Sequence, residues 1–186
     1  MRIVAGVHGG RRIDAPKGTG TRPTPERVRE AVFSMLGSLD GLVVLDLFAG
    51  SGAMGLEALS RGAERATLVD RDRSACASIE RNVDVLGVRE RCRVLRADWR
   101  RALESASDDQ NAYDIVFLDP PYGAWATLQE DLGQALGPLV APSGRVVAEH
   151  PASEVLSLSH MQVERRRTYG DTAVSFLVPT ASSLES

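Results

Sequence analysis

The sequence predicts an α/β fold with a doubly wound, mostly parallel sheet of seven strands that ends in an antiparallel hairpin. Apolar runs of strand length alternate with segments of helical spacing from residue 42 to residue 150, a pattern typical of parallel sheets. The segments 162–169 and 172–179 are then separated only by Gly170 and Asp171, which leaves no room for a crossover helix. We therefore expect one α/β domain, preceded by a small β-hairpin and a helix.

The N-terminal extension contains the predicted hairpin and helix. Two short runs, 2–7 and 11–16, flank the pair Gly9 and Gly10, which favours a hairpin with arginines on one face. Thr24 is suited to cap the following helix, and Pro25 fits its first turn. The apolar side chains expected on one face of this helix are Val28, Val32 and Met35.

The rest of the chain predicts the sheet and its helices. The run 42–48 is continuously apolar apart from one acid and ends near glycines, which indicates a strand buried on both faces. Further strands are expected at 66–70, 92–98, 114–119 and 144–150, and helices at 53–62, 73–87 and 125–139. These elements divide the chain into an extension at 1–37, a domain at 38–180 and a frayed tail at 181–186.

Charge is distributed unevenly along the chain. Residues 1–30 contain seven bases and three acids, a net charge of +4, whereas the whole chain carries −3 and the remainder therefore −7. A basic arm on an acidic body favours a polyanionic partner, although a solvated flank would give the same pattern. We expect this arm to be an appendage whose removal leaves any cofactor site intact.

The cysteines and histidines do not form a recognisable metal or redox motif. Cys76 and Cys92 are isolated in the sequence, so we expect core side chains in a reducing cytoplasm, with neither a disulfide nor a bound metal. His8, His150 and His160 are expected as surface or capping residues. No stretch approaches the roughly 18 apolar residues of a membrane span, and we expect a cytoplasmic monomer without a membrane association.

A glycine-rich loop follows the first strand of the predicted sheet. Gly50, Gly52 and Gly55 have the spacing that lets a backbone turn sharply towards a ligand, and Asp70 ends the next strand, where an acid binds ribose hydroxyls. This pattern predicts a nucleoside-type cofactor. Asp46 would repel the pyrophosphate of a dinucleotide but suits a ligand with an ammonium and a sulfonium group, so electrostatics favour S-adenosylmethionine.

Two further sequence positions complete the predicted site. Asp98 ends the third strand, where it could accept a hydrogen bond from an adenine amine with Trp99 against the ring, or could cap a helix. The stretch Asp119-Pro120-Pro121-Tyr122 ends the fourth strand, which a doubly wound sheet places beside the first. Its prolines stiffen the turn and remove backbone donors, Asp119 adds an acceptor, and Tyr122 adds a ring for base stacking. Such a turn suits a planar exocyclic amine.

These motifs resemble a known family. "DLFAGSG", the acid in "LVDRD" and "DPPY" are similar to those of class I S-adenosylmethionine-dependent amino-methyltransferases, which have a Rossmann-like fold. The segments "RIVAGVHGGRRI" and "RPTPERVREAVFSML" narrow the likeness to bacterial guanine-N2 methyltransferases of 16S ribosomal RNA, and the resemblance extends from Arg2 to about Tyr122.

The resemblance implies roles for individual residues. The implied cofactor-binding residues are Asp46, Phe48, Gly50 and Gly52 at the methionine end, Asp70 at the ribose, and Asp98 and Trp99 at the adenine. The implied catalytic residues are Asp119, Pro120, Pro121 and Tyr122, and the implied RNA-binding residues are Arg2, Arg11, Arg12, Lys17 and Arg22. The extension 1–37 would then bind RNA, and 38–180 would be the methyltransferase domain.

The expected activity is methyl transfer from S-adenosylmethionine to the exocyclic N2 of a guanine in 16S ribosomal RNA, free or in a small-subunit particle. Three alternatives remain open. Adenine-N6 methylation of DNA or RNA uses the same type of turn, a nicotinamide-dependent oxidoreductase could use the glycine loop, and a non-catalytic RNA-binding module would bind without methylation.

Overall fold

The structure is a computed structural model, which describes residues 1–16, 25–108, 112–121 and 123–180. By their internal contacts, the residues divide into two compact units, Met1–Trp99 and Arg100–Ser186. This division falls inside the segment 38–180 that the sequence predicts as one domain. Among the described residues, no helix has the length and apolar character needed to span a membrane.

The strands confirm the predicted fold class. They are β1 (Val43–Asp46), β2 (Arg65–Asp70), β3 (Cys92–Arg96), β4 (Tyr113–Leu118), β5 (Val140–Pro151), β6 (Met161–Tyr169) and β7 (Thr172–Pro179). Their order in the sheet is β3-β2-β1-β4-β5-β7-β6. The protein is therefore α/β, with a mostly parallel seven-stranded sheet that ends in the antiparallel hairpin of β6 and β7.

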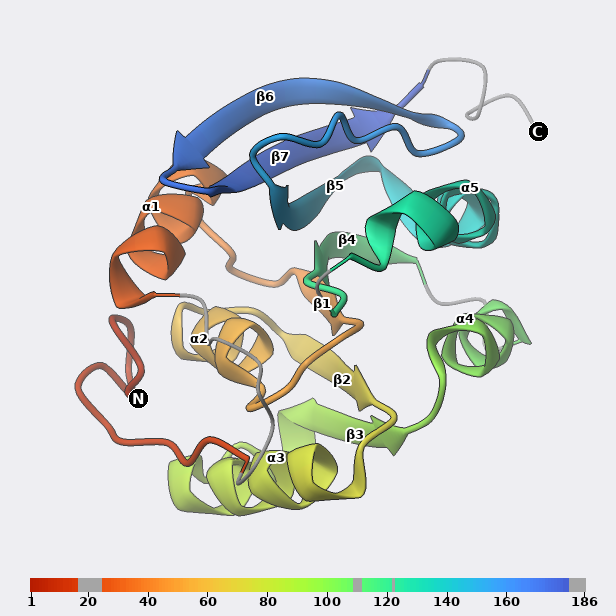
Figure 1. The fold of residues 1–186 in the computed structure, drawn as a ribbon. Helices are drawn as coiled ribbons and strands as arrows, with labels where there is room; N and C mark the ends of the chain where they lie inside the picture. Colours follow the sequence, from red (N-terminus) through yellow and green to blue (C-terminus); the bar gives the residue numbers. More distant parts are fainter. Residues whose placement is uncertain (17–24, 109–111, 122, 181–186) are drawn as a thin grey trace. The chain divides into compact units, whose positions relative to one another are not determined.

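The first unit contains β1, β2 and β3, which pair in parallel, together with three helices (Figure 1). The helices are α1 (Glu26–Leu36), α2 (Ala53–Ser60) and α3 (Arg73–Leu86). The buried positions of β1 and β2 are mostly apolar, and the helices that follow them bury Leu56, Leu59 and Ile79 completely or almost so. Because the three strands are parallel, their carboxyl ends lie at the same edge of the sheet.

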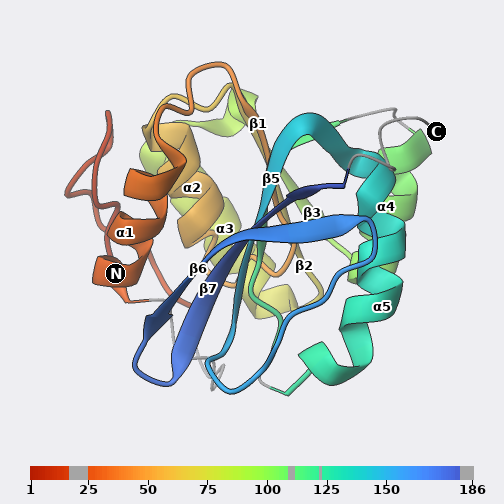
Figure 2. The ribbon, with the colours of Figure 1, turned by 90° about the horizontal axis from the view of Figure 1, so that it is seen from above.

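The second unit contains β4, β5, β6 and β7 with the helices α4 (Trp99–Asp108), most of which it includes, and α5 (Trp125–Leu136). The two helices lie side by side in Figure 2, and the side chains of Arg100 and Asp131 join them with an ion pair of 2.6 Å. β5 pairs in parallel with β4 and antiparallel with β7. β6 also pairs antiparallel with β7, as the two-residue turn between them requires.

The N-terminal hairpin is reduced to a single antiparallel bridge between Arg2 and Arg12. The ladder does not continue because the backbone amides of Val4 and Ala5 donate to a side chain of α2 instead of to an opposite strand. Helix α1 begins after Pro25, which occupies the N-cap position rather than the first turn, and Thr24 lies outside the described residues. Val28 and Val32 are buried as predicted, whereas Met35 is only half-buried.

The expectation for His150 was wrong. It is 3% exposed, and its Nε2 and Nδ1 lie 2.9 Å from Ser175 Oγ and 3.0 Å from the carbonyl oxygen of Pro151. This histidine is therefore buried between β5 and β7 and is not a surface residue. Its burial is tolerated because both ring nitrogens have hydrogen-bond partners. Cys76 and Cys92 are buried and unpaired, as expected of core side chains.

Candidate active site

The loop between β1 and α2 has a backbone that requires glycine. Gly50 has φ 54° and Gly52, the N-cap of α2, has φ 78°, both in the left-handed region. A Cβ atom on Gly52 would lie 2.7 Å from the Leu68 side chain of β2. The loop therefore turns within a space that a larger residue would fill, and it leads directly into the N-terminus of α2.

Asp46 is the last residue of β1 and is buried beneath this loop, with 4% of its surface exposed. Its Oδ2 accepts a hydrogen bond of 3.0 Å from the backbone amide of Gly55. Burial raises the pKa of Asp46 to about 7, and the nearby charge of Asp70 adds to the rise, while the Gly55 amide opposes it. Among the described residues, no cationic side chain pairs with Asp46.

Asp70, the last residue of β2, holds the same loop from the other side. Its Oδ2 accepts from the amide of Gly50 at 2.8 Å, and its Oδ1 accepts from the amide of Asp72 at 2.8 Å. Each carboxylate oxygen can accept a second hydrogen bond, so Asp70 retains capacity for a hydroxyl ligand. The half-buried carboxylate of Asp70 couples the position of the glycine loop to the end of β2.

Asp98 and Trp99 lie just beyond the end of β3. The chain there remains beside β2, because the amide of Ala97 donates to the carbonyl of Asp70 at 3.1 Å. Asp98 is exposed and immediately precedes α4, the position that both of its predicted roles require. Trp99 is only 5% exposed, so little of its ring is available for a ligand. The first unit therefore gathers the three aspartates that end or follow β1, β2 and β3 at one edge of its sheet.

The turn after β4 belongs to the second unit. Asp119 and Pro121 are exposed and Pro120 is buried, while Tyr122 lies outside the described residues. The amide of Ala124 donates to the carbonyl of Pro121 at 3.0 Å, which leads the turn into α5. Trp125, which the sequence analysis did not single out, anchors the start of α5, since its Nε1 donates to the carbonyl of Glu149 on β5 at 2.8 Å.

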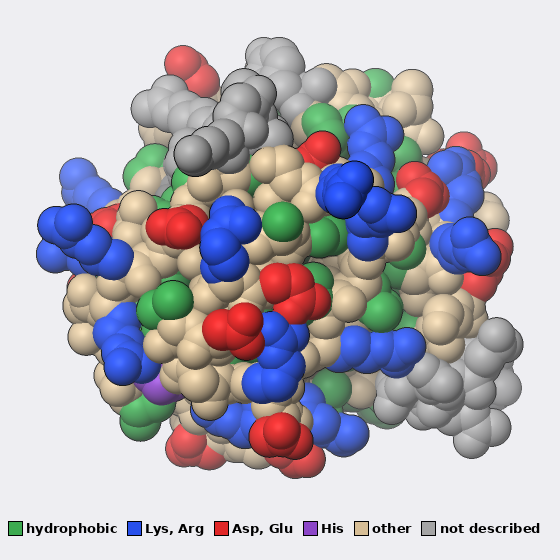
Figure 3. Space-filling model, turned by 90° about the horizontal axis from the view of Figure 1, so that it is seen from below, with side chains coloured by type: hydrophobic (Ala, Val, Ile, Leu, Met, Phe, Trp, Pro, Cys, Tyr) green, Lys and Arg blue, Asp and Glu red, His purple; other side chains and the backbone are tan. Residues whose placement is uncertain are grey.

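The charged side chains of the arm are partly committed to the protein itself. Arg2 pairs with Glu26 at 3.1 Å, and Arg11 Nη1 donates to the carbonyls of Val85 and Leu86 at the end of α3. Arg12 is exposed, and Lys17 and Arg22 lie outside the described residues. On the face drawn in Figure 3, basic and acidic side chains are interspersed, so charge alone marks no single binding patch there.

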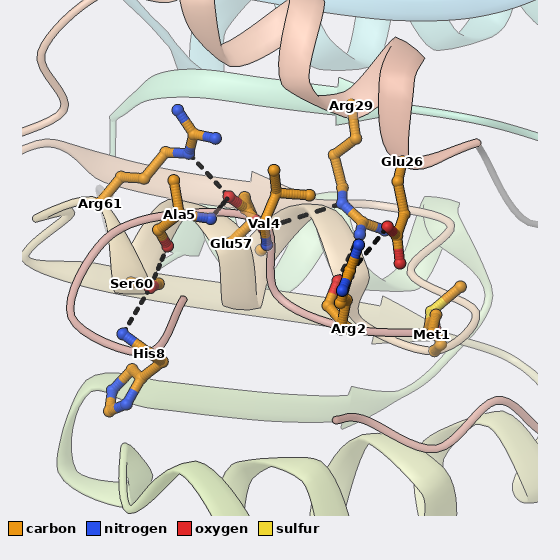
Figure 4. A network of polar contacts seen from close by, with 12 residues as sticks. Met1, Arg2, Val4, Ala5, His8, Glu26, Arg29, Glu57, Ser60 and Arg61 are labelled. Atoms are coloured by element: carbon orange, nitrogen blue, oxygen red, sulfur yellow. Dashed lines mark hydrogen bonds and ion pairs between the residues drawn. The ribbon is translucent and has the colours of Figure 1, made fainter. Parts of the chain in front are cut away.

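The arm is fastened to α2 by a buried carboxylate that sequence reasoning missed. Glu57 has no exposed side-chain surface, and it accepts hydrogen bonds from the amides of Val4 and Ala5 at 2.7 and 2.9 Å. Arg61 and Arg29 lie on either side of it, at 2.8 and 3.8 Å (Figure 4). The available signal was one acid in the mostly apolar helix segment "AMGLEALS".

A second contact joins the arm to the glycine loop. Asn82 on α3 is 2% exposed and exchanges hydrogen bonds of 2.7 and 2.9 Å with the backbone of Asp14. Its Nδ2 also donates to the carbonyl of Ser51 at 3.0 Å. With Ile3 and Ile13 buried as well, the arm is part of the first unit's core and not the separable appendage expected from the sequence.

Comparison with known proteins gives the relationship of this chain. The family model described as "Conserved hypothetical protein 95" matches residues 1–178. The chain belongs to this family. Its match to the family covers both compact units, from the arm to β7.

Two relatives carry names that state an activity. The chain is 38% identical over 183 residues to "Putative rRNA methyltransferase YlbH" of Bacillus subtilis, covering 94% of this chain and 97% of that protein. It is 39% identical over 123 residues to "Ribosomal RNA small subunit methyltransferase D" of Escherichia coli, covering 66% of this chain and 60% of that one. The family is thus one of bacterial rRNA methyltransferases.

Solved structures agree with the fold. "Putative methyltransferase yhhF" of Escherichia coli superposes with a TM-score of 0.81 at 30% identity, over 97% of this chain and 98% of that one. A more distant structure bears the description "SMU.776, a putative methyltransferase complexed with SAH". It has a TM-score of 0.64 at 17% identity over 81% of this chain and 48% of that one, and it supports the fold alone.

Proposed function

We propose that this protein transfers a methyl group from S-adenosylmethionine to the exocyclic N2 of a guanine in 16S ribosomal RNA. The observation that carries the proposal is Asp46, a carboxylate buried under a glycine loop at the end of β1, with no cationic partner among the described residues. A buried carboxylate is costly unless it is paired, and a cationic ligand in the loop would supply the partner. A pyrophosphate in the same place would be repelled, which argues against a nicotinamide cofactor.

The residues present fit this cofactor. Asp46 would face its ammonium, with Phe48, Gly50 and Gly52 along the methionine end, while Asp70 would accept from the ribose hydroxyls and Asp98 from the adenine amine. Trp99 would offer at most the edge of its ring, since it is 5% exposed. When bound, S-adenosylmethionine supplies a methyl group on a positively charged sulfur, and that sulfur is readily displaced by an attacking nitrogen.

The turn after β4 is the proposed binding site of the amine. Ligands of doubly wound sheets bind at the carboxyl ends of the strands, and Asp119 directly follows the carboxyl end of β4. Asp119 would accept a hydrogen bond from the amine and orient its lone pair, and the proton released would pass to an acceptor there or to water. Pro120 and Pro121 stiffen the turn, and Tyr122 remains a predicted stacking surface.

The relatives support the choice of substrate. Both name ribosomal RNA, and one names the small subunit. The arm residues Arg2, Arg11, Arg12, Lys17 and Arg22 remain the proposed RNA contacts within the extension 1–37, although two of them also bind the protein. We propose a cytoplasmic enzyme that acts as a monomer without a metal.

The test of this proposal is the substitution Asp119→Ala. We expect single-turnover methyl transfer to small-subunit ribosomal RNA to slow about 100-fold or more, because the amine loses the group that orients it. Cofactor affinity, measured by calorimetry, should be unchanged. The matched control is Asp171→Ala, which removes an exposed carboxylate from the turn between β6 and β7 of the same unit.

Two results would contradict the proposal. A rate for Asp119→Ala close to that of the control would remove Asp119 from the reaction. Mapping of the methylated base gives the second: a methyl group on adenine N6 would favour the adenine alternative, and no methyl group on RNA despite bound cofactor would favour a binding module.

A further inference from the structure

The edge strand β6 exposes both of its faces. Every residue from Gln162 to Thr168 is exposed, whereas its neighbour β7 is buried along most of its length. A strand that covers a core on one side alternates between buried and exposed positions, and β6 does not. Because β6 is the last strand in the sheet order, its outer edge is also unpaired.

β6 carries three consecutive arginines in a unit that is otherwise acidic. The unit Arg100–Ser186 contains six bases and twelve acids, and half of the bases are Arg165, Arg166 and Arg167. Since successive side chains of a strand point to opposite faces, the three arginines place positive charge on both sides of the strand.

The described part of the chain does not neutralise this charge. Glu164, the acid next to the run, pairs with Arg145 on β5 at 3.4 Å. Arg166 donates to the carbonyl of Ala152 at 2.6 Å, a contact that leaves its charge uncompensated. Among the residues that the structure describes, none of the three arginines forms an ion pair.

The strand registers place the arginine run level with the end of β4. Arg166 is paired with Ser175 on β7, Ser175 with Ala148 on β5, and Ala148 with Leu118, the last residue of β4. Leu118 directly precedes Asp119. Three strand spacings of about 4.8 Å separate β6 from β4, so the run lies roughly 14 Å from the proposed amine-binding turn.

We propose that β6 is a second RNA-binding surface, on which Arg165, Arg166 and Arg167 bind phosphates of the strand that carries the target base. The inference rests on the proposed function for the identity of the RNA. Arginine matches phosphate with paired N–H donors, and a run of phosphates is the polyanion that fits an unpaired row of guanidinium groups. A single-stranded RNA bound in this way would extend from the turn after β4 to β6.

The test compares two charge-matched double variants. Arg165→Ala with Arg167→Ala removes two charges from one face of β6, and Arg65→Ala with Arg89→Ala removes two exposed charges from the first unit, where both already pair with acids. The probe is transcribed small-subunit ribosomal RNA, with affinity measured across a range of salt concentrations. Log affinity falls as log salt concentration rises, and we expect this fall to be less steep for the β6 variant. The magnitude of the slope should decrease by about 1.4, at about 0.7 for each phosphate contact with single-stranded RNA.

The control variant should leave this slope within experimental error of the parent's, and both variants should bind cofactor normally. A parent-like slope for the β6 variant would overturn the proposal. Arginines on an edge strand also prevent pairing with other copies, so self-association of the β6 variant with an unchanged slope would assign them that role instead. If the parent bound this RNA but did not methylate it, the proposed function would fail, while the slopes would still decide the role of β6.

Discussion

At the scale of single residues, Asp46 links cofactor binding to pH. Its pKa is about 7 in the unliganded protein, so below neutrality the carboxyl is mostly neutral. A cationic ligand binds the ionised form, so binding below pH 7 must release a proton. We expect the affinity for S-adenosylmethionine to fall about tenfold for each pH unit below 7 and to level off above it.

Calorimetry in buffers with different ionisation enthalpies would measure the released proton directly. The variant Asp46→Asn keeps an oxygen for the Gly55 amide but cannot ionise, so it should bind weakly and with no dependence on this pKa. Binding by the parent without proton release at pH 6 would show that Asp46 does not face the ammonium.

At the scale of elements, the arm and α2 form one structural piece through Glu57. The substitution Glu57→Gln leaves the buried Arg29 and the half-buried Arg61 without their anionic partner and turns an NH2 group towards one of the backbone amides of Val4 and Ala5. Removing one partner of a buried ion pair costs about 3–5 kcal/mol. We expect a loss of that order in the free energy of unfolding, measured by urea denaturation.

The control for this prediction is Glu26→Gln. Glu26 pairs with Arg2 in an exposed ion pair, which contributes about 0–1 kcal/mol. The buried atoms Nε and Nη1 of Arg29 already lack hydrogen-bond partners, so the native site has no spare acceptor to replace Glu57. Equal losses from the two variants would show that Glu57 does not fasten the arm.

At the scale of the whole molecule, His150 makes stability depend on pH. Burial lowers the pKa of His150 from its usual 6.5, and the charge of Arg166 adds to this effect, while the hydrogen bond to Pro151 opposes it. The unfolded chain therefore binds more protons than the native protein once the pH falls below about 6.5. We expect the contribution of His150 to the free energy of unfolding to be constant above pH 7 and to decrease as the pH falls from 6.5 to 5.

The variant His150→Asn isolates this effect. It should be less stable than the parent at pH 8, where the parent keeps both hydrogen bonds of the ring, and the difference should narrow as the pH falls towards 5. Urea denaturation of both proteins at each pH measures the difference. A gap that stays constant with pH would mean that His150 binds its proton equally in the folded and unfolded states.

The sequence by itself determined the succession of elements and the glycine loop. Period and composition act locally, so the apolar runs, the two-residue turn before β7 and the positive φ angles at Gly50 and Gly52 could be predicted from neighbouring residues. The three aspartates at or just beyond the ends of β1, β2 and β3 followed from the rule that parallel strands align their carboxyl ends.

Only the tertiary structure decided what the charged and polar residues inside these elements contact. Charged residues such as Glu57 and Arg29 usually lie at the surface, yet both are fully buried. Their partners come from the arm and from two helices, at positions far apart in the sequence. His150 was predicted at the surface and is buried, since Ser175 reaches it only through strand pairing. The arginines of β6 became a candidate surface for the same reason: the register of four strands, which no local pattern encodes, aligns them with the end of β4.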